Sequence, residues 1–212
     1  MKRSNQRTTD NSGADCGRLG KNMIFRRLTP SDAPEYRRLR LYGLRESPSA
    51  FGSSFEEEAK RALQSYETRM ENSDDRWTIG ALSGNRLIGV VTLVRDTSRK
   101  GSHKAGIFGM YVSPRWRKKG VGRELIGQAI DVAKHLRGLK QLHLAVTSSN
   151  RPALSLYESA GFVSYGEEPR ALFVKGRYYS EALLCLKLGA EPVISANGPE
   201  RPWHTLNDRQ KS

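Results

Sequence analysis

The sequence contains few of the residues that stabilise small secreted proteins or span membranes. Its 212 residues include two cysteines, Cys16 in a polar stretch and Cys185 in an apolar run, which is too few for a disulfide framework. No stretch approaches the roughly 20 apolar residues of a membrane span, and the first residues lack the apolar centre of a signal peptide. We therefore expect a cytoplasmic protein in a reducing setting, without a membrane partner.

Acidic residues are also scarce, because 22 Asp and Glu stand against 36 Lys and Arg, for a formal net charge of +14. Such a balance raises nucleic acid as a partner. The excess is spread along the chain, however, and no run resembles a basic helix with polar residues that could read DNA bases. We therefore do not expect nucleic acid as the physiological partner; a salt-dependent shift with DNA or RNA would show otherwise.

The pattern of histidines and cysteines does not favour metal or cysteine chemistry. His103, His135 and His143 are scattered and lack the spacing of metal ligands. Cys185 lies in a pattern that fits a buried strand, and Cys16 lies in the polar N-terminal stretch. We therefore predict neither a metal site nor a covalent cysteine intermediate.

The chain is organised as one domain between two polar tails. Residues 1–22 carry almost no large apolar residue and residues 189–212 contain three prolines, so we expect both to be flexible. Hydrophobic patterning predicts the order strand, two helices, three strands, helix, strand, helix and two strands. The strands are expected at residues 23–28, 76–82, 87–94, 106–112 and 142–146 and twice within 162–188. This order predicts an α+β fold with a mixed sheet.

The most informative segment joins an apolar run, residues 107–112, to an amphipathic helix pattern that begins near Val121. The connecting loop is basic and contains Gly120 and Gly122. A strand that leads through a loop into a helix can direct several backbone N–H groups, and the positive end of the helix dipole, at one anion. Glycines let a phosphate approach those amides closely. We therefore predict a pyrophosphate site.

Two other phosphate-binding loops do not fit this segment. A P-loop requires Lys followed by Ser or Thr after its second glycine, whereas Arg123 follows Gly122. The dinucleotide-binding fingerprint requires a third glycine and an acidic residue at the end of the next strand, where this chain has Leu125 and Thr147. A mononucleotide or dinucleotide site of either type is excluded.

The loop resembles motif A of the GCN5-related N-acetyltransferases (GNAT). That motif has Arg or Gln, two residues, Gly, one residue, and Gly or Ala; Arg117, Gly120 and Gly122 fill these places. In the family this loop holds the pyrophosphate of acetyl-CoA. The resemblance therefore implies acetyl-CoA as cosubstrate, bound by Met110, Tyr111, Val112, Arg117, Lys118, Lys119, Gly120, Val121, Gly122 and Arg123.

A second segment, residues 150–162, resembles motif B of the same family, in which Asn, Ala, Tyr and Gly-Phe recur at this spacing. Asn150 can cap a helix, and Gly161 suits its left-handed exit. At 100° per residue, Ala153 and Tyr157 lie within about 60° and 20° of Asn150, so the three share one helix face. The resemblance places this face at the cofactor. Taken alone, Tyr157 could instead be an ordinary half-buried aromatic and Asn150 only a cap.

The resemblance covers roughly residues 23–188 and implies a single GNAT-like domain with a twisted, mostly antiparallel sheet flanked by helices. In GNAT proteins the fourth strand splays from the fifth and pairs with the pantetheine arm, and a backbone amide there polarises the thioester carbonyl. Tyr157 would be the acid that protonates the leaving thiolate. Many family members carry a Glu on the fourth strand, but residues 107–110 contain no acid. The base is left open among Glu56–Glu58, Asp96 and water.

The sequence thus predicts an acetyl-CoA-dependent N-acetyltransferase that transfers the acetyl group directly to a primary amine in a ternary complex. A catalytically inactive CoA-binding regulatory module is the alternative, and a basic nucleic-acid binder is a third hypothesis. The acceptor is undetermined among small amines, amino-acid derivatives and protein amines, and a homodimer is left open.

Overall fold

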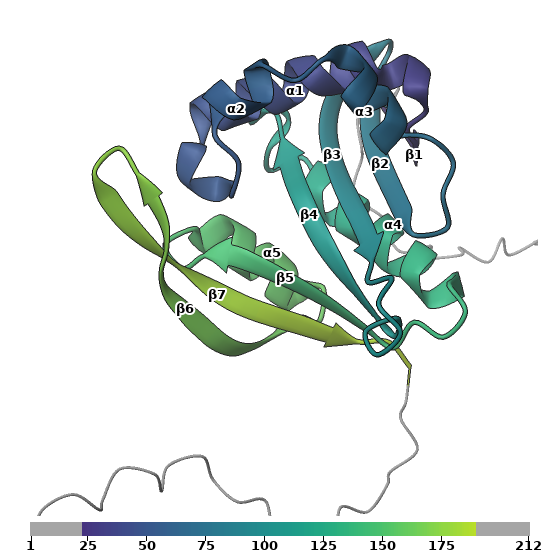
Figure 1. Ribbon diagram of the computed structural model, residues 1–212, viewed down its shortest axis with the longest axis vertical. Coiled ribbons are helices and arrows are strands. Elements are labelled where there is room, and N and C mark those ends of the chain that lie inside the picture. The colour runs from purple at the N-terminus through teal and green to yellow at the C-terminus, as the bar shows by residue number, and fades with distance from the viewer. Residues whose placement is uncertain (1–22, 190–212) are drawn as a thin grey trace, which may run out of the picture.

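A computed structural model describes residues 23–189 (Figure 1). The tails expected at residues 1–22 and 189–212 lie, apart from residue 189, outside the described residues, so the domain limits stay a prediction. The strands are β1 Met23–Arg27, β2 Arg76–Ser83, β3 Arg86–Arg95, β4 Lys104–Val112, β5 Gln141–Thr147, β6 Val163–Val174 and β7 Arg177–Lys187. The α-helices are α1 Ala33–Glu46, α2 Phe55–Ala59, α3 Leu63–Arg69, α4 Val121–His135 and α5 Arg151–Ser159.

The strands form one sheet in the order β1-β2-β3-β4-β5-β7-β6. Among these pairs only β4 and β5 run parallel, and all the others are antiparallel. The expected α+β fold with a mostly antiparallel sheet is therefore confirmed. The parallel pair follows from the connection, because α4 carries the chain back to the end of the sheet at which β4 begins, so that β5 runs in the same direction as β4.

The core has two parts, one on each face of the sheet. Helix α4 packs through Leu125 and Ile126 with apolar side chains of β2–β5. Helix α1 packs through Leu39 with Leu87 and Val90 of β3 on the other face (Figure 1). Strand β3 is buried along nearly its whole length because both faces are covered. A continuous apolar run is what such a strand requires.

One region differs from the sequence expectation, since two short helices, α2 and α3, replace the single second helix. The chain turns after Ala59, and the buried Glu58 carboxylate then pairs with both Arg61 and Arg69. A continuous helix could not bring Arg69 back to Glu58, eleven residues earlier in the chain. None of the helices between residues 23 and 189 is long and apolar enough to cross a membrane.

The feature that creates the functional site is the divergence of β4 from β5 (Figure 1). The two strands pair only from Lys104 to Gly106 and then separate. On its other edge β4 stays paired with β3, but its register shifts between Val90 and Thr92. Gly109 sits in this bulge at φ 60°, a left-handed conformation that glycine adopts readily. The edge of β4 beyond Gly106 therefore faces a gap instead of a neighbouring strand.

Candidate functional site

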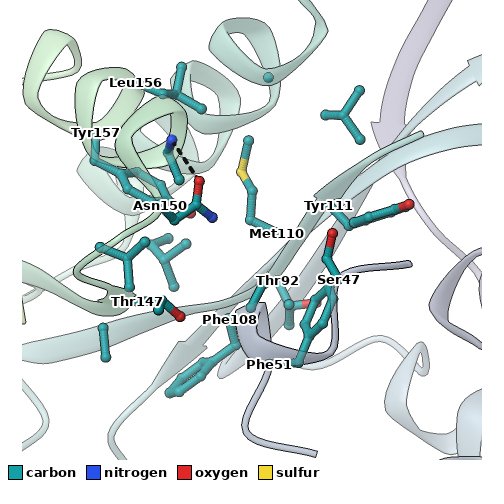
Figure 2. A pocket seen from close by; sticks show the side chains of 18 of the residues that line it. Ser47, Phe51, Thr92, Phe108, Met110, Tyr111, Thr147, Asn150, Leu156 and Tyr157 are labelled. Carbon is teal, nitrogen blue, oxygen red and sulfur yellow. Dashed lines mark hydrogen bonds between the residues drawn. The ribbon is translucent and has the colours of Figure 1, made fainter. Parts of the chain in front are cut away.

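A cavity of about 1340 Å³ fills the gap between β4 and β5. Its walls come from β4, the loop after β4, the end of β5, α5, and the region from α1 to α3, with further residues of β2, β3 and β7. Figure 2 shows Met110 and Phe108 of β4, Tyr157 of α5, and Phe51 from the segment between α1 and α2. The motif residues predicted from two distant segments therefore lie around one space.

The loop after β4 presents the start of α4 to this cavity. Gly120 is the N-cap residue at φ 82°, and the first intrahelical bond runs from the Glu124 N–H to the Gly120 carbonyl at 3.0 Å. The N–H groups before Glu124 consequently have no partner in the helix. Lys118, Gly120, Gly122 and Arg123 line the cavity, as expected of an anion site.

Two other predicted loop residues contribute differently. The side chain of Val121 is fully buried in the core, so only its backbone is available to a ligand. The Lys119 ammonium lies 5.0 Å from the centroid of the Trp116 ring and is outside the cavity lining. Tertiary packing, which cannot be read from the motif, determines where the side chains of Val121 and Lys119 lie.

The Arg117 side chain is held by protein groups. Its Nη1 and Nη2 donate to Glu46 Oε1 and Oε2 at 3.0 and 2.7 Å, and its Nε donates to the Val112 carbonyl. Glu46 also accepts a hydrogen bond from the Tyr111 hydroxyl at 3.1 Å. The guanidinium therefore ties the loop to the end of α1 and to β4. Glu46, which sequence reasoning missed, carries no motif signal.

The three predicted residues of β4 lie on two faces of the strand, with Met110 and Val112 both near Gly122 and Tyr111 on the opposite face. Tyr111 is buried against α1 and Phe51, with ring centroids 6.0 Å apart, so it contributes its backbone to the cavity. Met110 points into the cavity opposite Tyr157 (Figure 2). A Cβ added at Gly122 would lie 3.6 Å from Met110 and 3.3 Å from Leu156 of α5. Gly122, in the first turn of α4, therefore lets β4 and α5 approach the start of this helix closely.

Helix α5 supplies the opposite wall. Asn150 caps it by accepting a hydrogen bond from the Ala153 N–H at 3.3 Å, and its amide nitrogen points toward Met110 (Figure 2). Asn150, Ala153 and Tyr157 all line the cavity, as helical spacing predicts. The cap and the cavity-facing role of Asn150 therefore coexist.

Tyr157 is the most deeply buried polar group of this wall. Its side chain is 7% exposed and packs edge-on against Phe162 at 5.9 Å. Burial raises the pKa of its phenol to about 12. The hydroxyl has no hydrogen-bond partner between residues 23 and 189. A protonated, unpaired donor therefore stands at the cavity wall at neutral pH.

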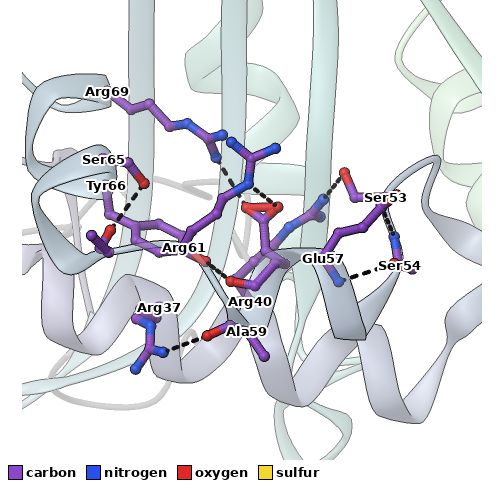
Figure 3. Close-up of polar contacts among 12 residues, drawn as sticks. Arg37, Arg40, Ser53, Ser54, Glu57, Ala59, Arg61, Ser65, Tyr66 and Arg69 are labelled. Atoms are coloured by element: carbon purple, nitrogen blue, oxygen red, sulfur yellow. Dashed lines mark hydrogen bonds and ion pairs between the residues drawn. The ribbon is translucent and has the colours of Figure 1, made fainter.

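The carboxylates considered as bases lie in very different places. Glu58 lines the cavity, but Arg61 and Arg69 engage its two oxygens at 3.2 and 3.0 Å. Glu57 caps α2 through Ser54, as Figure 3 shows, and Glu56 is exposed. Asp96 follows β3, where it accepts from the Ser98 N–H, outside the cavity lining. None of these groups is a free carboxylate facing the cavity.

Glu181 of β7 is a carboxylate at the cavity that sequence reasoning did not consider as a base. It lines the cavity, and it is paired in the sheet with Thr147 on one side and Glu168 on the other. Burial, followed by the repulsion of Glu168, raises the pKa of the Glu181 carboxyl above its usual range. Its only sequence signal is an acid directly before the apolar run of residues 182–186.

The described part of the chain contains no group of three His, Cys, Asp or Glu residues that could hold a metal ion. Cys185, expected in a buried strand, is only partly buried in β7 and does not line the cavity. The groups available for chemistry are therefore a phenol, a carboxylate, the backbone of β4 and the helix terminus. Together they suit an extended ligand with a phosphate at one end.

Comparison with known proteins agrees with this geometry. The family model for the acetyltransferase (GNAT) family matches residues 40–162, more than half of the chain. Spermidine N(1)-acetyltransferase from Vibrio cholerae is 32% identical over 108 residues, which are 51% of this chain and 60% of that protein. The match thus spans less than two thirds of that relative.

Solved structures confirm the fold. A GNAT-family acetyltransferase from Streptococcus pneumoniae has a TM-score of 0.72 at 23% identity and covers 79% of this chain and 100% of its own. An acetyltransferase from Salmonella typhimurium, solved with its cofactor acetyl-CoA, has a TM-score of 0.68 at 18% identity and covers 83% of this chain and 99% of its own.

The Glu46–Arg117 pair predicts a pH-dependent loss of stability. Hydrogen bonds from Arg117 are the main cause that lowers the Glu46 pKa from 4.5 to about 2. A carboxyl group whose pKa is lower in the folded than in the unfolded protein stabilises the fold at pH values above the unfolded-state pKa. This stabilisation is lost as the pH falls toward the folded-state pKa of about 2. Because Arg117 is 42% exposed, screening limits the contribution to about 1 kcal/mol.

Glu46→Gln should therefore lower the free energy of unfolding by about 1 kcal/mol at pH 7, and this difference should shrink at pH 3. Urea unfolding at both pH values measures it. Glu56→Gln is the control, because Glu56 is exposed and has no ion pair among the described residues. A difference that is equally large at pH 3 would contradict the pairing.

Proposed function

The chain belongs to the GNAT acetyltransferase family, and from this premise we propose that it is an N-acetyltransferase that transfers the acetyl group of acetyl-CoA directly to a primary amine. The observation that carries the proposal is the convergence of the α4 N-terminus, the unpaired edge of β4 and Tyr157 on one cavity. Acetyl-CoA supplies the reactive thioester, and both substrates occupy the cavity together. Acetyl-CoA-dependent thiol release with a panel of amines tests it, and no release with any amine would favour an inactive CoA-binding module.

The residues of the cavity fit acetyl-CoA in three places. The free N–H groups at Gly120–Arg123 suit the pyrophosphate, since they lie at the positive end of a 15-residue helix. The unpaired edge of β4 suits the amides of the pantetheine arm, which can extend the sheet in place of β5. Met110, Leu156 and Ala153 give the arm apolar contacts.

Glu181 is proposed as the general base. A lysine-like amine has a pKa near 10.4, so roughly one molecule in a thousand is neutral at pH 7. The enzyme must therefore remove a proton from the ammonium form. Glu181 has no ion-pair partner among residues 23–189, and its raised pKa makes it a stronger base than an exposed glutamate. Glu58, held by two arginines, is less available.

Tyr157 is proposed as the acid beside the leaving sulfur. The leaving thiolate, whose thiol has a pKa near 8.5, is a weaker base than the phenolate of Tyr157, whose phenol has a pKa of about 12, so complete proton transfer from Tyr157 is uphill by about 5 kcal/mol. Its main contribution is therefore a hydrogen bond that stabilises negative charge as it develops on the sulfur. A backbone N–H of β4 near Met110 is proposed to do the same for the carbonyl oxygen.

Tyr157→Phe should lower kcat roughly 100-fold and change the Kd of acetyl-CoA little, because only the hydroxyl is lost. Steady-state kinetics and titration calorimetry separate the two quantities. Tyr178→Phe serves as the control, since Tyr178 is 59% exposed. In the wild type, ionisation of Tyr157 should not lower the rate below pH 10, because its pKa is about 12. Equal losses of kcat and affinity in Tyr157→Phe would assign Tyr157 to binding alone.

Glu181→Gln should lower kcat roughly 100-fold at pH 7. The loss should diminish as pH approaches the pKa of the amine, because the neutral amine then needs no base. Glu168→Gln is a matched variant: removing its charge should lower the Glu181 pKa and move the acid limb of the kcat profile to lower pH. Profiles between pH 5 and pH 10 measure both effects, and a loss in Glu181→Gln that does not vary with pH would argue against a base.

A further inference from the structure

Arg40 of α1 places a positive charge in the cavity without a carboxylate to balance it. Its Nη2 donates to the Ser53 hydroxyl at 3.3 Å, as Figure 3 shows, and its guanidinium lies 4.6 Å from the centroid of the Phe51 ring. Its Nη1 is buried and has no hydrogen-bond partner. No ion pair of Arg40 occurs between residues 23 and 189. A buried donor left unpaired is costly, which points to a missing ligand.

The unpaired nitrogen lies next to the β4 bulge. Arg40 Nη1 is 3.8 Å from the position that a Cβ on Gly109 would occupy. Met110 follows in the chain, and we have placed the reacting carbonyl beside its backbone. The phosphate end of the cosubstrate is placed at Gly120, whereas Arg40 lies near the proposed position of the reacting carbonyl. A group bound by Arg40 is therefore part of the acceptor.

The charged side chains of the acceptor part of the cavity differ in sign between the α1 side and the β7 side. Arg76 lines it as well and has no ion pair in the described part of the chain. The charge of Glu58 is already balanced by its two arginines. Glu181 lies on β7, in the part of the sheet beyond β5, whereas Arg40 lies on the helix that packs against β3. The cavity thus offers unpaired positive charge on the α1 side and unpaired negative charge on the β7 side.

We infer that the acceptor is an amine that also carries a carboxylate, with the carboxylate bound by Arg40 and the amine directed toward Glu181. This inference rests on the proposed function and names its substrate class. A guanidinium is planar and binds carboxylates in a defined orientation. Phe51, Ile107 and Phe108 provide apolar surface for the carbon skeleton between the two charged ends. A polyamine, with a cation at each end, would place a positive charge beside Arg40 or Arg76.

The test compares amino acids with their own amides, so that each pair differs only in the carboxylate. Pairs of α-, β- and γ-amino acids vary the separation of amine and acid. The wild-type protein should show a kcat/KM roughly 10- to 100-fold higher for the acid of the best pair, as a charge-assisted hydrogen bond to a carboxylate implies. Spermidine should be a poorer acceptor than that acid.

Arg40→Gln should bring the acid-to-amide ratio close to one, and Arg40→Lys, which keeps the charge without the planar fork, should give an intermediate ratio. Arg86→Gln is the matched control, because it removes one exposed arginine at the start of β3 and should leave the ratio unchanged. Calorimetric titration of the CoA-bound protein with the same pairs gives a second readout that needs no turnover.

The outcomes separate the inference from the proposed function. Acetyl transfer with equal use of acid and amide, or with a ratio unchanged in Arg40→Gln and Arg40→Lys, overturns the inference and leaves the function standing. A preference for phosphoethanolamine over every amino acid would show that Arg40 binds a phosphate and not a carboxylate, and it would also overturn the inference. Absence of transfer to any amine, with CoA-bound protein that binds acid and amide equally, overturns both.

Discussion

The separation of β4 from β5 after Gly106 is the constraint on which the rest of the site depends. Three residue pairs hold the two strands together at one end, while β4 stays paired with β3 on both sides of the bulge at Gly109 as it turns away from β5. An unpaired strand edge inside a sheet is costly unless a ligand supplies the missing partners. The cavity, the exposed β4 backbone and the position of α5 all follow from this separation.

Although the overall charge is +14, several charged side chains of the site are paired with a group of opposite charge. The arginine of the phosphate loop is neutralised by Glu46, so the loop is held in shape while its backbone N–H groups remain available. Glu58 is neutralised in the same way by two arginines. Arg40 and Glu181 have no ion-pair partner among the described residues and lie at different places in one cavity. We attribute acceptor recognition to these two.

The sequence predicted the fold and family well because both depend on local patterns. Gly120 and Gly122 between an apolar run and an amphipathic helix identified the loop, and the Asn150–Tyr157 spacing identified the facing helix. Groups brought in by tertiary packing were not predictable. Arg40 and Glu46 lie on α1 and Glu181 lies on β7, and no sequence spacing links them to the motif residues. The break between α2 and α3 was missed for the same reason, since Glu58 acquires its partners only in the folded chain.

Calorimetric titration of acetyl-CoA into wild-type protein and Gly120→Val tests the central claim most directly. A valine at φ 82° would distort the start of α4 and move its N–H groups, so affinity should fall at least about tenfold. Gly84→Val is the control, because Gly84 is also left-handed, at φ 57°, but lies in the open turn between β2 and β3. Affinity should fall in Gly120→Val alone. Unchanged affinity in Gly120→Val, or an equal loss in both variants, would contradict the assignment of this loop as the pyrophosphate site.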